Sequence, residues 1–291
     1  MTPSRRQALA GAGAALIAAP AAASAGARGV AGAAPRRVVS LASCLDAILV
    51  HVADRGQIAA LSHYAREPIG STIAEVARTL PFTWETAEEV IALRPDLVLT
   101  SRHSALATRN ALGRMKIPTQ LFAVPDSVAA SLDQVREIAR LVGRPERGEA
   151  LIARIEAAVA ASAPPPGSTP LTALIYQPNG FAAGRGTLMD EMMTRAGFEN
   201  VAGRYGLGKW GNVPVERLLA DPPQVLLSGV PVRGSRTWAD RVMRHPVLKS
   251  LSGRMVQTQL EEKLLYCGGP VLIHTAAALA QARRTALEAL T

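Results

Sequence analysis

Short runs of β-branched and other apolar residues alternate with segments of helical periodicity along this chain, and one long helical stretch interrupts the alternation. Strands that alternate with helices of this length form βαβ units around a mostly parallel sheet. Because strand-like runs stand on both sides of the helical stretch, the sequence predicts two α/β lobes. The strand-like runs cover residues 37–41, 58–61, 97–100, 119–124, 171–176, 224–228 and 255–259.

The helical stretch between the two halves predicts two consecutive helices. Residues 127–142 carry apolar side chains at helical spacing, and Gly143 ends that pattern. Pro145 suits the first turn of a second helix, which runs to about Ser162. At about 1.5 Å per residue this second helix is roughly 25 Å long, which is enough to connect two lobes. The spacing therefore predicts a bridge made of helices.

The first 25 residues have the features of an export signal. Arg5 and Arg6 supply a positive start, Ala8–Ala23 is apolar, and Ala25 ends a small-x-small cleavage site. The adjacent arginines resemble a twin-arginine signal, and an ordinary secretory signal stays the alternative. Both predict export, so we expect the protein in the periplasm.

These patterns together divide the chain into five predicted segments. A signal peptide is followed by a flexible lead-in, an N-terminal α/β lobe, a helical bridge and a C-terminal α/β lobe. The bounds are 1–25, 26–35, 36–126, 127–167 and 168–291, in that order.

The charge balance favours some partners over others. The formal net charge of +9 results from 32 Lys and Arg against 23 Asp and Glu, and the basic residues are scattered without a continuous block. A generally basic surface favours anionic ligands, and we expect no nucleic-acid partner. After the N-terminus no stretch reaches the ~18 uninterrupted apolar residues of a membrane span. We expect a monomer.

The motifs of common enzyme classes are missing from the sequence. Gly184–Thr187 is too short for a phosphate-binding loop, and no Gly-x-Ser-x-Gly pattern is present. We therefore expect a binding protein without a resident cofactor. A periplasmic enzyme with a two-lobed cleft is the less favoured alternative.

Four segments stand in a specific order along the chain, namely Arg37–Leu41, Leu93–Leu99, Ile138–Gly143 and Leu218–Leu227. In order and spacing they resemble the periplasmic substrate-binding proteins of bacterial ABC importers for cobalamin and iron–siderophore complexes. The resemblance extends from Pro35 to the end of the chain. It implies a class III periplasmic binding protein, with two Rossmann-like lobes joined by one long helix around a ligand cleft. It also implies capture of a metal-chelate nutrient (cobalamin, a ferric siderophore or heme) and its delivery to an ABC importer.

Aromatic residues make up only 4% of the chain, so their positions are informative. Open α/β lobes bind ligands beyond the carboxyl ends of their strands, and rings in those loops bury a large flat ligand with little loss of entropy. The resemblance to cobalamin-binding members implies such contacts. Rings in the core beneath the loops are the alternative, which stays open for Phe82 and Trp84. The predicted ligand-binding rings are Tyr64, Phe82, Trp84, Phe181 and Trp210.

Polar candidates occupy the same predicted loops. Arg102 and Arg185 suit phosphate, carboxylate or catecholate groups through fork-shaped hydrogen bonds, with solvated loop charges as the alternative. His63 and His103, with Cys44, have side chains that can ligate a transition metal or the metal centre of a chelate. Their spacing matches no dense metal motif, so we predict no metal site. A free-metal binder of the same fold stays an alternative.

The two cysteines of the chain are Cys44 and Cys267. A disulfide between them would tie the two lobes together in an oxidising compartment. Because such a tie would hinder opening of the cleft, we do not expect it, although the sequence leaves the state of both cysteines open.

The resemblance also implies a contact with the membrane permease, since one glutamate on each lobe of such proteins docks against permease arginines. Glu88 and Glu216 match that pattern. Two separated carboxylates can fix orientation through charge-assisted pairs. Acids placed near helix N-termini by the helix dipole are the alternative, and Glu85 and Glu89 are rivals of Glu88.

Overall fold

The computed structural model describes residues 34–177, 180–229 and 254–291. The predicted signal peptide and most of the predicted lead-in lie outside these residues. In the part of the chain that is described, no helix is both long and apolar enough to cross a membrane.

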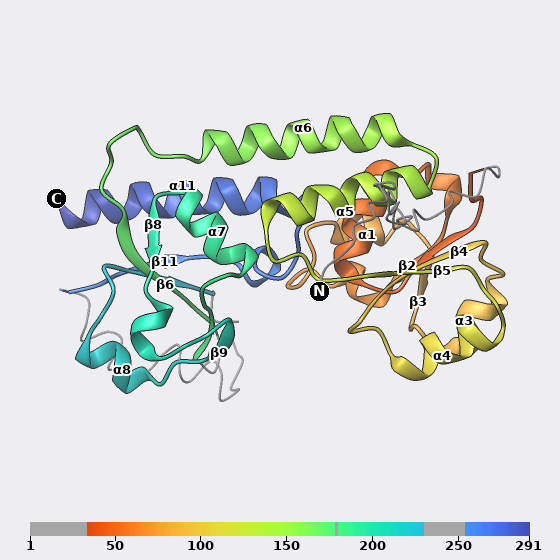
Figure 1. Cartoon of the computed structure of the whole chain (residues 1–291), viewed down its shortest axis with the longest axis horizontal. Coiled ribbons are helices and arrows are strands. Elements are labelled where there is room, and N and C mark those ends of the chain that lie inside the picture. The colour runs from red at the N-terminus through yellow and green to blue at the C-terminus, as the bar shows by residue number, and fades with distance from the viewer. Residues whose placement is uncertain (1–33, 178–179, 230–253) are drawn as a thin grey trace, which may run out of the picture. The chain divides into compact units, whose positions relative to one another are not determined.

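The first lobe contains a five-stranded parallel sheet with the strand order β3-β2-β1-β4-β5 (Figure 1). From β1 the chain builds outward to β3, and it then crosses to the other side of β1 to form β4 and β5. The direction of the connections therefore reverses between β1 and β4, and such a switch point is a common ligand position. The strands are β1 (Val38–Ser40), β2 (Ile58–Ser62), β3 (Phe82–Thr83), β4 (Leu97–Ser101) and β5 (Thr119–Phe122).

Both faces of this sheet are covered, because successive residues of its strands enter different hydrophobic clusters. Val38 and Leu99 pack in the main core, whereas Val39 and Val98 pack in a second cluster. Strands buried on both faces are continuous apolar runs, which explains why they stand out in the sequence. The helices of this lobe are α1 (Ser43–Val52), α2 (Ala74–Ala77), α3 (Ala87–Ala92) and α4 (Leu106–Arg114), with the 3₁₀ turns η1 (Arg55–Gln57) and η2 (His63–Arg66).

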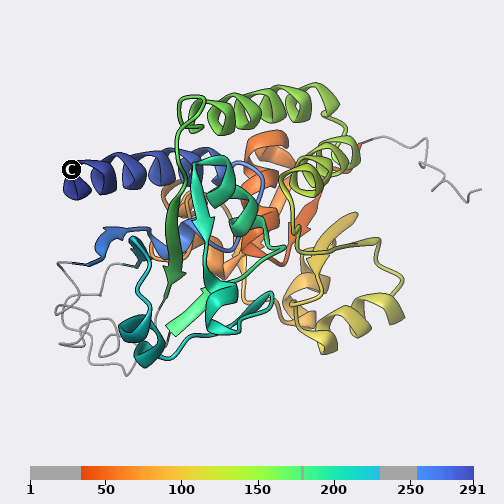
Figure 2. The same ribbon diagram turned by 60° about the vertical axis from the view of Figure 1, so that its left-hand side comes forward.

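The bridge consists of α5 (Val128–Leu141) and α6 (Pro145–Ala161), so the predicted long second helix is confirmed. Ser127 caps α5 through its side chain, and the proline at the start of α6 supplies a suitable first turn. α6 packs against α5, α1 and α7, and along α11 (Val271–Leu290). Figures 1 and 2 both show α6 and α11 side by side. α6 therefore links elements that precede it and elements that follow it.

The second lobe contains a four-stranded parallel sheet with the order β11-β10-β6-β8, and a separate antiparallel pair, β7 and β9. The strands of the main sheet are β6 (Leu171–Tyr176), β8 (Phe198–Asn200), β10 (Val225–Ser228) and β11 (Val256–Gln259). The pair is β7 (Phe181–Ala183) with β9 (Trp210–Asn212), and the remaining elements are α7 (Leu188–Arg195), α8 (Val215–Ala220), η4 (Ala202–Tyr205) and η5 (Glu262–Leu264).

The structure confirms the predicted two-lobed α/β fold, and the predicted long strands and helices agree with it within about two residues at each end. The sequence patterns do not predict four short strands of two or three residues each, namely β3, β7, β8 and β9. Elements that short contain too few residues for an alternating pattern to be recognised.

Candidate functional site

A cavity of about 560 Å³ lies between the two lobes, and both lobes supply its lining. In the first lobe the lining comes mainly from the loops after β1 and β4, at the switch point of the sheet. The volume is typical of small-molecule sites. The lining residues are Leu41–Leu45, Tyr64, Glu85, Ser101, His103 and Ser104 from the first lobe, residues 123–125 and Gln134 next to and in the bridge, and Phe181, Trp210 and Tyr266 from the second lobe.

We call Phe181, Trp210 and Tyr266 the second-lobe wall. The rings of Phe181 and Trp210 are stacked, with centroids 5.5 Å apart and planes inclined by 6°. Trp210 pairs with Ala183 across the antiparallel pair, two residues beyond Phe181, so both rings project from the same face. Trp210 is 46% exposed, which leaves much of its ring free to contact a ligand.

We call Tyr64, Glu85 and His103 the first-lobe wall. Tyr64 lies in η2, directly after β2, and it remains 54% exposed. His103 follows β4 and is exposed; its backbone N–H donates to the hydroxyl of Ser101. This wall therefore offers a phenol and an imidazole to the same cavity.

Glu85 is a cavity residue that the sequence suggested only as a rival docking acid. Its backbone has φ 69°, a region that non-glycine residues rarely occupy. The conformation is held by two hydrogen bonds, one from the Glu85 N–H to the Thr83 hydroxyl and one from the Thr108 hydroxyl to the Glu85 carbonyl. Burial raises the pKa of the Glu85 carboxyl from 4.5 to about 7.

Behind Tyr64, the Nδ1 atom of His63 lies 3.7 Å from Oε1 of Glu85, beyond hydrogen-bonding distance. Both atoms are buried, and neither has a hydrogen-bond partner among the described residues. The His63 ring also packs, tilted, against the rings of Tyr64 and Trp84, with centroids 3.8 and 4.8 Å away. His63 thus supports Tyr64 and is absent from the cavity lining.

Other predicted ligand residues also stand outside the lining. Phe82 and Trp84 are exposed on β3 and just after it, whereas Thr83 between them is buried, so the strand's alternation turns both rings outward. Their rings meet edge to face, and Arg66 lies over Phe82. The exposed Arg102 and Arg185 are not among the lining residues, although Arg102 lies between two of them.

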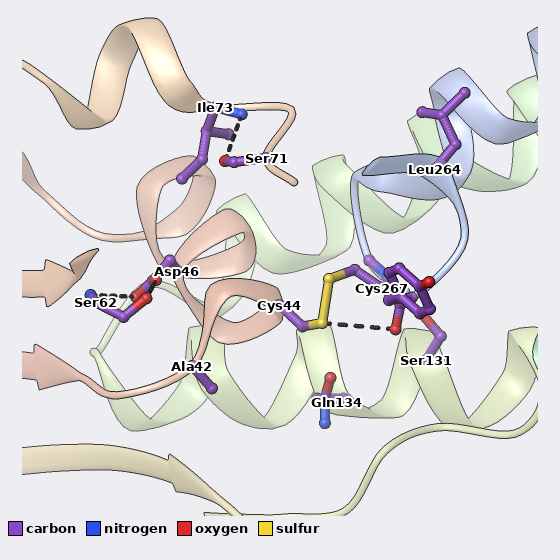
Figure 3. The surroundings of a disulfide bond; sticks show 12 residues. Ala42, Cys44, Asp46, Ser62, Ser71, Ile73, Ser131, Gln134, Leu264 and Cys267 are labelled. Carbon is purple, nitrogen blue, oxygen red and sulfur yellow. Dashed lines mark hydrogen bonds between the residues drawn. A yellow bond between two sulfur atoms is a disulfide. The ribbon is translucent and has the colours of Figure 1, made fainter. Parts of the chain in front are cut away.

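The cysteines form a disulfide, Cys44–Cys267, which the sequence reading did not expect. Figure 3 shows Cys44 at the start of α1 and Cys267 in the loop before α11, close to Ser131 of α5. The expectation from the sequence places Cys267 with the second lobe. In the structure the loop that carries Cys267 packs on α1 and α5. The disulfide therefore joins this loop to α1 beside the cavity, and Cys44 forms part of the lining.

The two predicted docking acids are exposed in the first turns of short helices, Glu88 in α3 and Glu216 in α8. Both helices lie on the side of the molecule away from α6 (Figures 1 and 2). Glu89 accepts hydrogen bonds from the Thr83 hydroxyl and from the Trp84 N–H. Since Glu85 faces the cavity, Glu88 is the acid of this group that is available to a partner.

In the described ranges, no three His, Cys, Asp or Glu side chains gather closely enough to hold a metal ion.

A model of the family described as periplasmic binding protein matches residues 38–253, about three quarters of the chain. This chain belongs to the periplasmic binding protein family. Its members are binding proteins, in line with the expectation from the sequence. A comparison with curated protein sequences gives no match.

Solved structures of other periplasmic binding proteins share the fold. The heme-binding protein RhuT of Roseiflexus sp. RS-1, in its apo form, is 24% identical with a TM-score of 0.70, over 88% of this chain and 99% of RhuT. The heme-binding protein BhuT, in complex with two hemes, is 21% identical with a TM-score of 0.69, and the match covers 88% of this chain and 99% of BhuT. The vitamin B12-binding protein BtuF of Vibrio cholerae is 17% identical with a TM-score of 0.63, and the match covers 87% of this chain and 98% of BtuF.

Proposed function

We propose that this chain is a periplasmic solute-binding protein that captures a metal-chelating tetrapyrrole, heme or cobalamin, and delivers it to an ABC importer. The observation that carries the proposal is the lining of the cavity, where the stacked rings of Phe181 and Trp210 share one space with Tyr64 and His103. Flat aromatic walls suit a broad macrocycle because rings bury large area with few rotatable bonds.

The chemistry of the lining supports a tetrapyrrole over a ferric siderophore. The surface of the cavity is mostly apolar, although about half of the lining residues carry a polar group. A siderophore presents many oxygen atoms that would lose water without a compensating partner in such a cavity. The similarity in fold to RhuT and BhuT, which bind heme, and to BtuF, which binds vitamin B12, supports the same choice.

Two lining side chains are suited to the metal of the cargo. A tyrosine phenol and a histidine imidazole both serve as axial ligands of heme iron in proteins. Tyr64 and His103 are the groups of those types in the first-lobe wall. Arg102, which lies between two lining residues, and the exposed Arg185 are proposed to reach acidic side arms of the ligand through charge-assisted hydrogen bonds.

Equilibrium titration of the purified protein tests the proposal. Hemin, cobalamin and a set of ferric siderophores are added separately, with absorbance and tryptophan fluorescence as readouts. Saturable one-to-one binding of hemin or cobalamin is expected. Failure of both tetrapyrroles to bind would overturn the proposal, and stoichiometric zinc or manganese in the purified protein would favour a free-metal binder instead.

Delivery is proposed to depend on Glu88 and Glu216. Replacing both with alanine should leave ligand affinity within about twofold and reduce uptake by about tenfold or more, because only the permease contact is lost. The matched control is the pair Glu156→Ala and Glu288→Ala, exposed acids on α6 and α11. Unchanged uptake by the Glu88 and Glu216 variant would contradict the docking role, and loss of ligand binding would show that these acids have another role.

A further inference from the structure

Tyr266 contributes a third ring to the second-lobe wall, and nothing so far gives it a role. It is 44% exposed, and it lines the main cavity together with Phe181 and Trp210. The same three residues border a small gap that Gln177 also lines, and the buried side-chain amide of Gln177 has no hydrogen-bond partner among the described residues. Tyr266 thus separates the cavity from an interior polar group.

The backbone that carries Tyr266 is fixed at the three residues that follow it. Cys267 is bound to Cys44 of α1 (Figure 3), and the N–H of Gly269 donates to the Ser131 hydroxyl at 2.6 Å. A Cβ on Gly268 would lie 2.3 Å from Ser131 Oγ, so this segment lies against α5 with no space for a side chain.

This anchoring separates Tyr266 from the other two rings of its wall. Phe181 and Trp210 belong to the β7–β9 pair of the second lobe, whereas Tyr266 is held by α1 and α5. The backbone that follows Tyr266 is therefore held independently of that pair. A ligand resting on Phe181 and Trp210 would meet a ring that is covalently tied to the first lobe.

We propose that Tyr266 is a ligand-contacting residue of this cavity and that the Cys44–Cys267 disulfide is the element that positions it. The inference rests on the proposed function, since it takes the cavity to be the tetrapyrrole site. The disulfide positions Tyr266 because Cys267 is the next residue in the chain, and its other half, Cys44, borders the cavity directly.

Four proteins test the inference: the wild type, Tyr266→Ala, the double variant Cys44→Ala with Cys267→Ala, and the triple variant. Each is titrated with hemin and with cobalamin at a temperature where circular dichroism shows all four folded. For the ligand that the wild type binds, we expect Tyr266→Ala to raise Kd about tenfold and the double variant about threefold to tenfold. The triple variant should lose less affinity than the product of the two separate losses, because the disulfide then has no ring to position.

Other results overturn the inference. Unchanged affinity in Tyr266→Ala would exclude the contact, and separate, multiplying losses in the triple variant would show that the disulfide acts independently of Tyr266. Either result leaves the proposed function intact, provided that the wild type binds the ligand. A wild type that binds neither tetrapyrrole removes the proposed function and the inference together.

Discussion

The two walls of the cavity differ in chemistry and in how the chain builds them. The first-lobe wall consists of single polar groups on separate loops, and it includes a carboxyl group whose pKa is raised to about 7 by burial. The second-lobe wall is aromatic, with two parallel rings fixed by a strand pair. A cavity built this way can hold a flat ligand by area on one side and by specific groups on the other.

Breaking the disulfide that ties the base of these walls should have the largest effect on stability. The bond joins residues 223 positions apart in the chain. Its loss therefore raises the conformational entropy of the unfolded chain, which destabilises the native state. Replacing Cys44 and Cys267 with alanine should lower the free energy of unfolding by about 3 to 5 kcal/mol, measured by urea denaturation. A change below about 1 kcal/mol would show that the tie contributes little.

The second-lobe wall is tested by two tryptophans that differ in position. Trp210 lines the cavity, whereas Trp84 is 61% exposed outside it. Trp210→Ala should weaken tetrapyrrole binding about 10- to 100-fold, about 1.4 to 2.8 kcal/mol, because a stacked ring is lost. Trp84→Ala is the control and should leave Kd unchanged. Equal losses in both variants would mean that the ligand also contacts Trp84, which the sequence analysis includes among the candidate ligand-binding rings.

The first-lobe wall is tested through the pH dependence of stability. The native pKa of the Glu85 carboxyl, about 7, lies above its ordinary value of 4.5, so the native state binds the proton more tightly than the unfolded state. The stabilisation is complete below pH 4.5 and is lost as pH rises to about 7.

Glu85→Gln should therefore unfold at higher urea concentration than the wild type at pH 8. We expect a gain of about 1 to 2 kcal/mol there, after allowance for solvent in the open cavity, and little gain at pH 4. The buried Asp46 also has a pKa raised to about 7, mainly by burial and least by the charge of Glu85, so Glu85→Gln removes this small contribution to the Asp46 pKa as well. A difference that does not depend on pH would contradict the assignment.

The smallest effect on stability is expected for an exposed ion pair, Lys209 with Asp126. Lys209 Nζ lies 3.1 Å from Asp126 Oδ2, and both side chains are more than 60% exposed. Exposed ion pairs contribute little, so Lys209→Ala should change the free energy of unfolding by less than about 1 kcal/mol. A larger loss in urea denaturation would mean that the two lobes depend on this contact.

Much of the second-lobe wall and part of the first could be predicted from the sequence. Open α/β sheets bind ligands beyond the carboxyl ends of their strands. This rule predicts that the loops after the strands meet at one cavity, and four of the cavity residues lie in such loops: Tyr64, His103, Phe181 and Trp210. Phe82 and Trp84 were included by the same rule, but the two-residue strand β3 was not visible, and its alternation turns both rings outward.

The remaining site residues depend on contacts that the sequence does not encode locally. The position of Glu85 follows from a positive φ in a non-glycine residue, stabilised by Thr83 and Thr108. The position of Tyr266 follows from a bond between cysteines far apart in the chain. Local patterns identify strands and loops, whereas such tertiary constraints decide which side chain enters the cavity.

A crystal structure of the protein with its bound tetrapyrrole tests the central claim most directly. The account predicts a macrocycle between the two walls, with one face on Phe181 and Trp210 and its metal within reach of Tyr64 or His103. A tetrapyrrole bound instead against Phe82 and Trp84, with the cavity filled only by water, would contradict it.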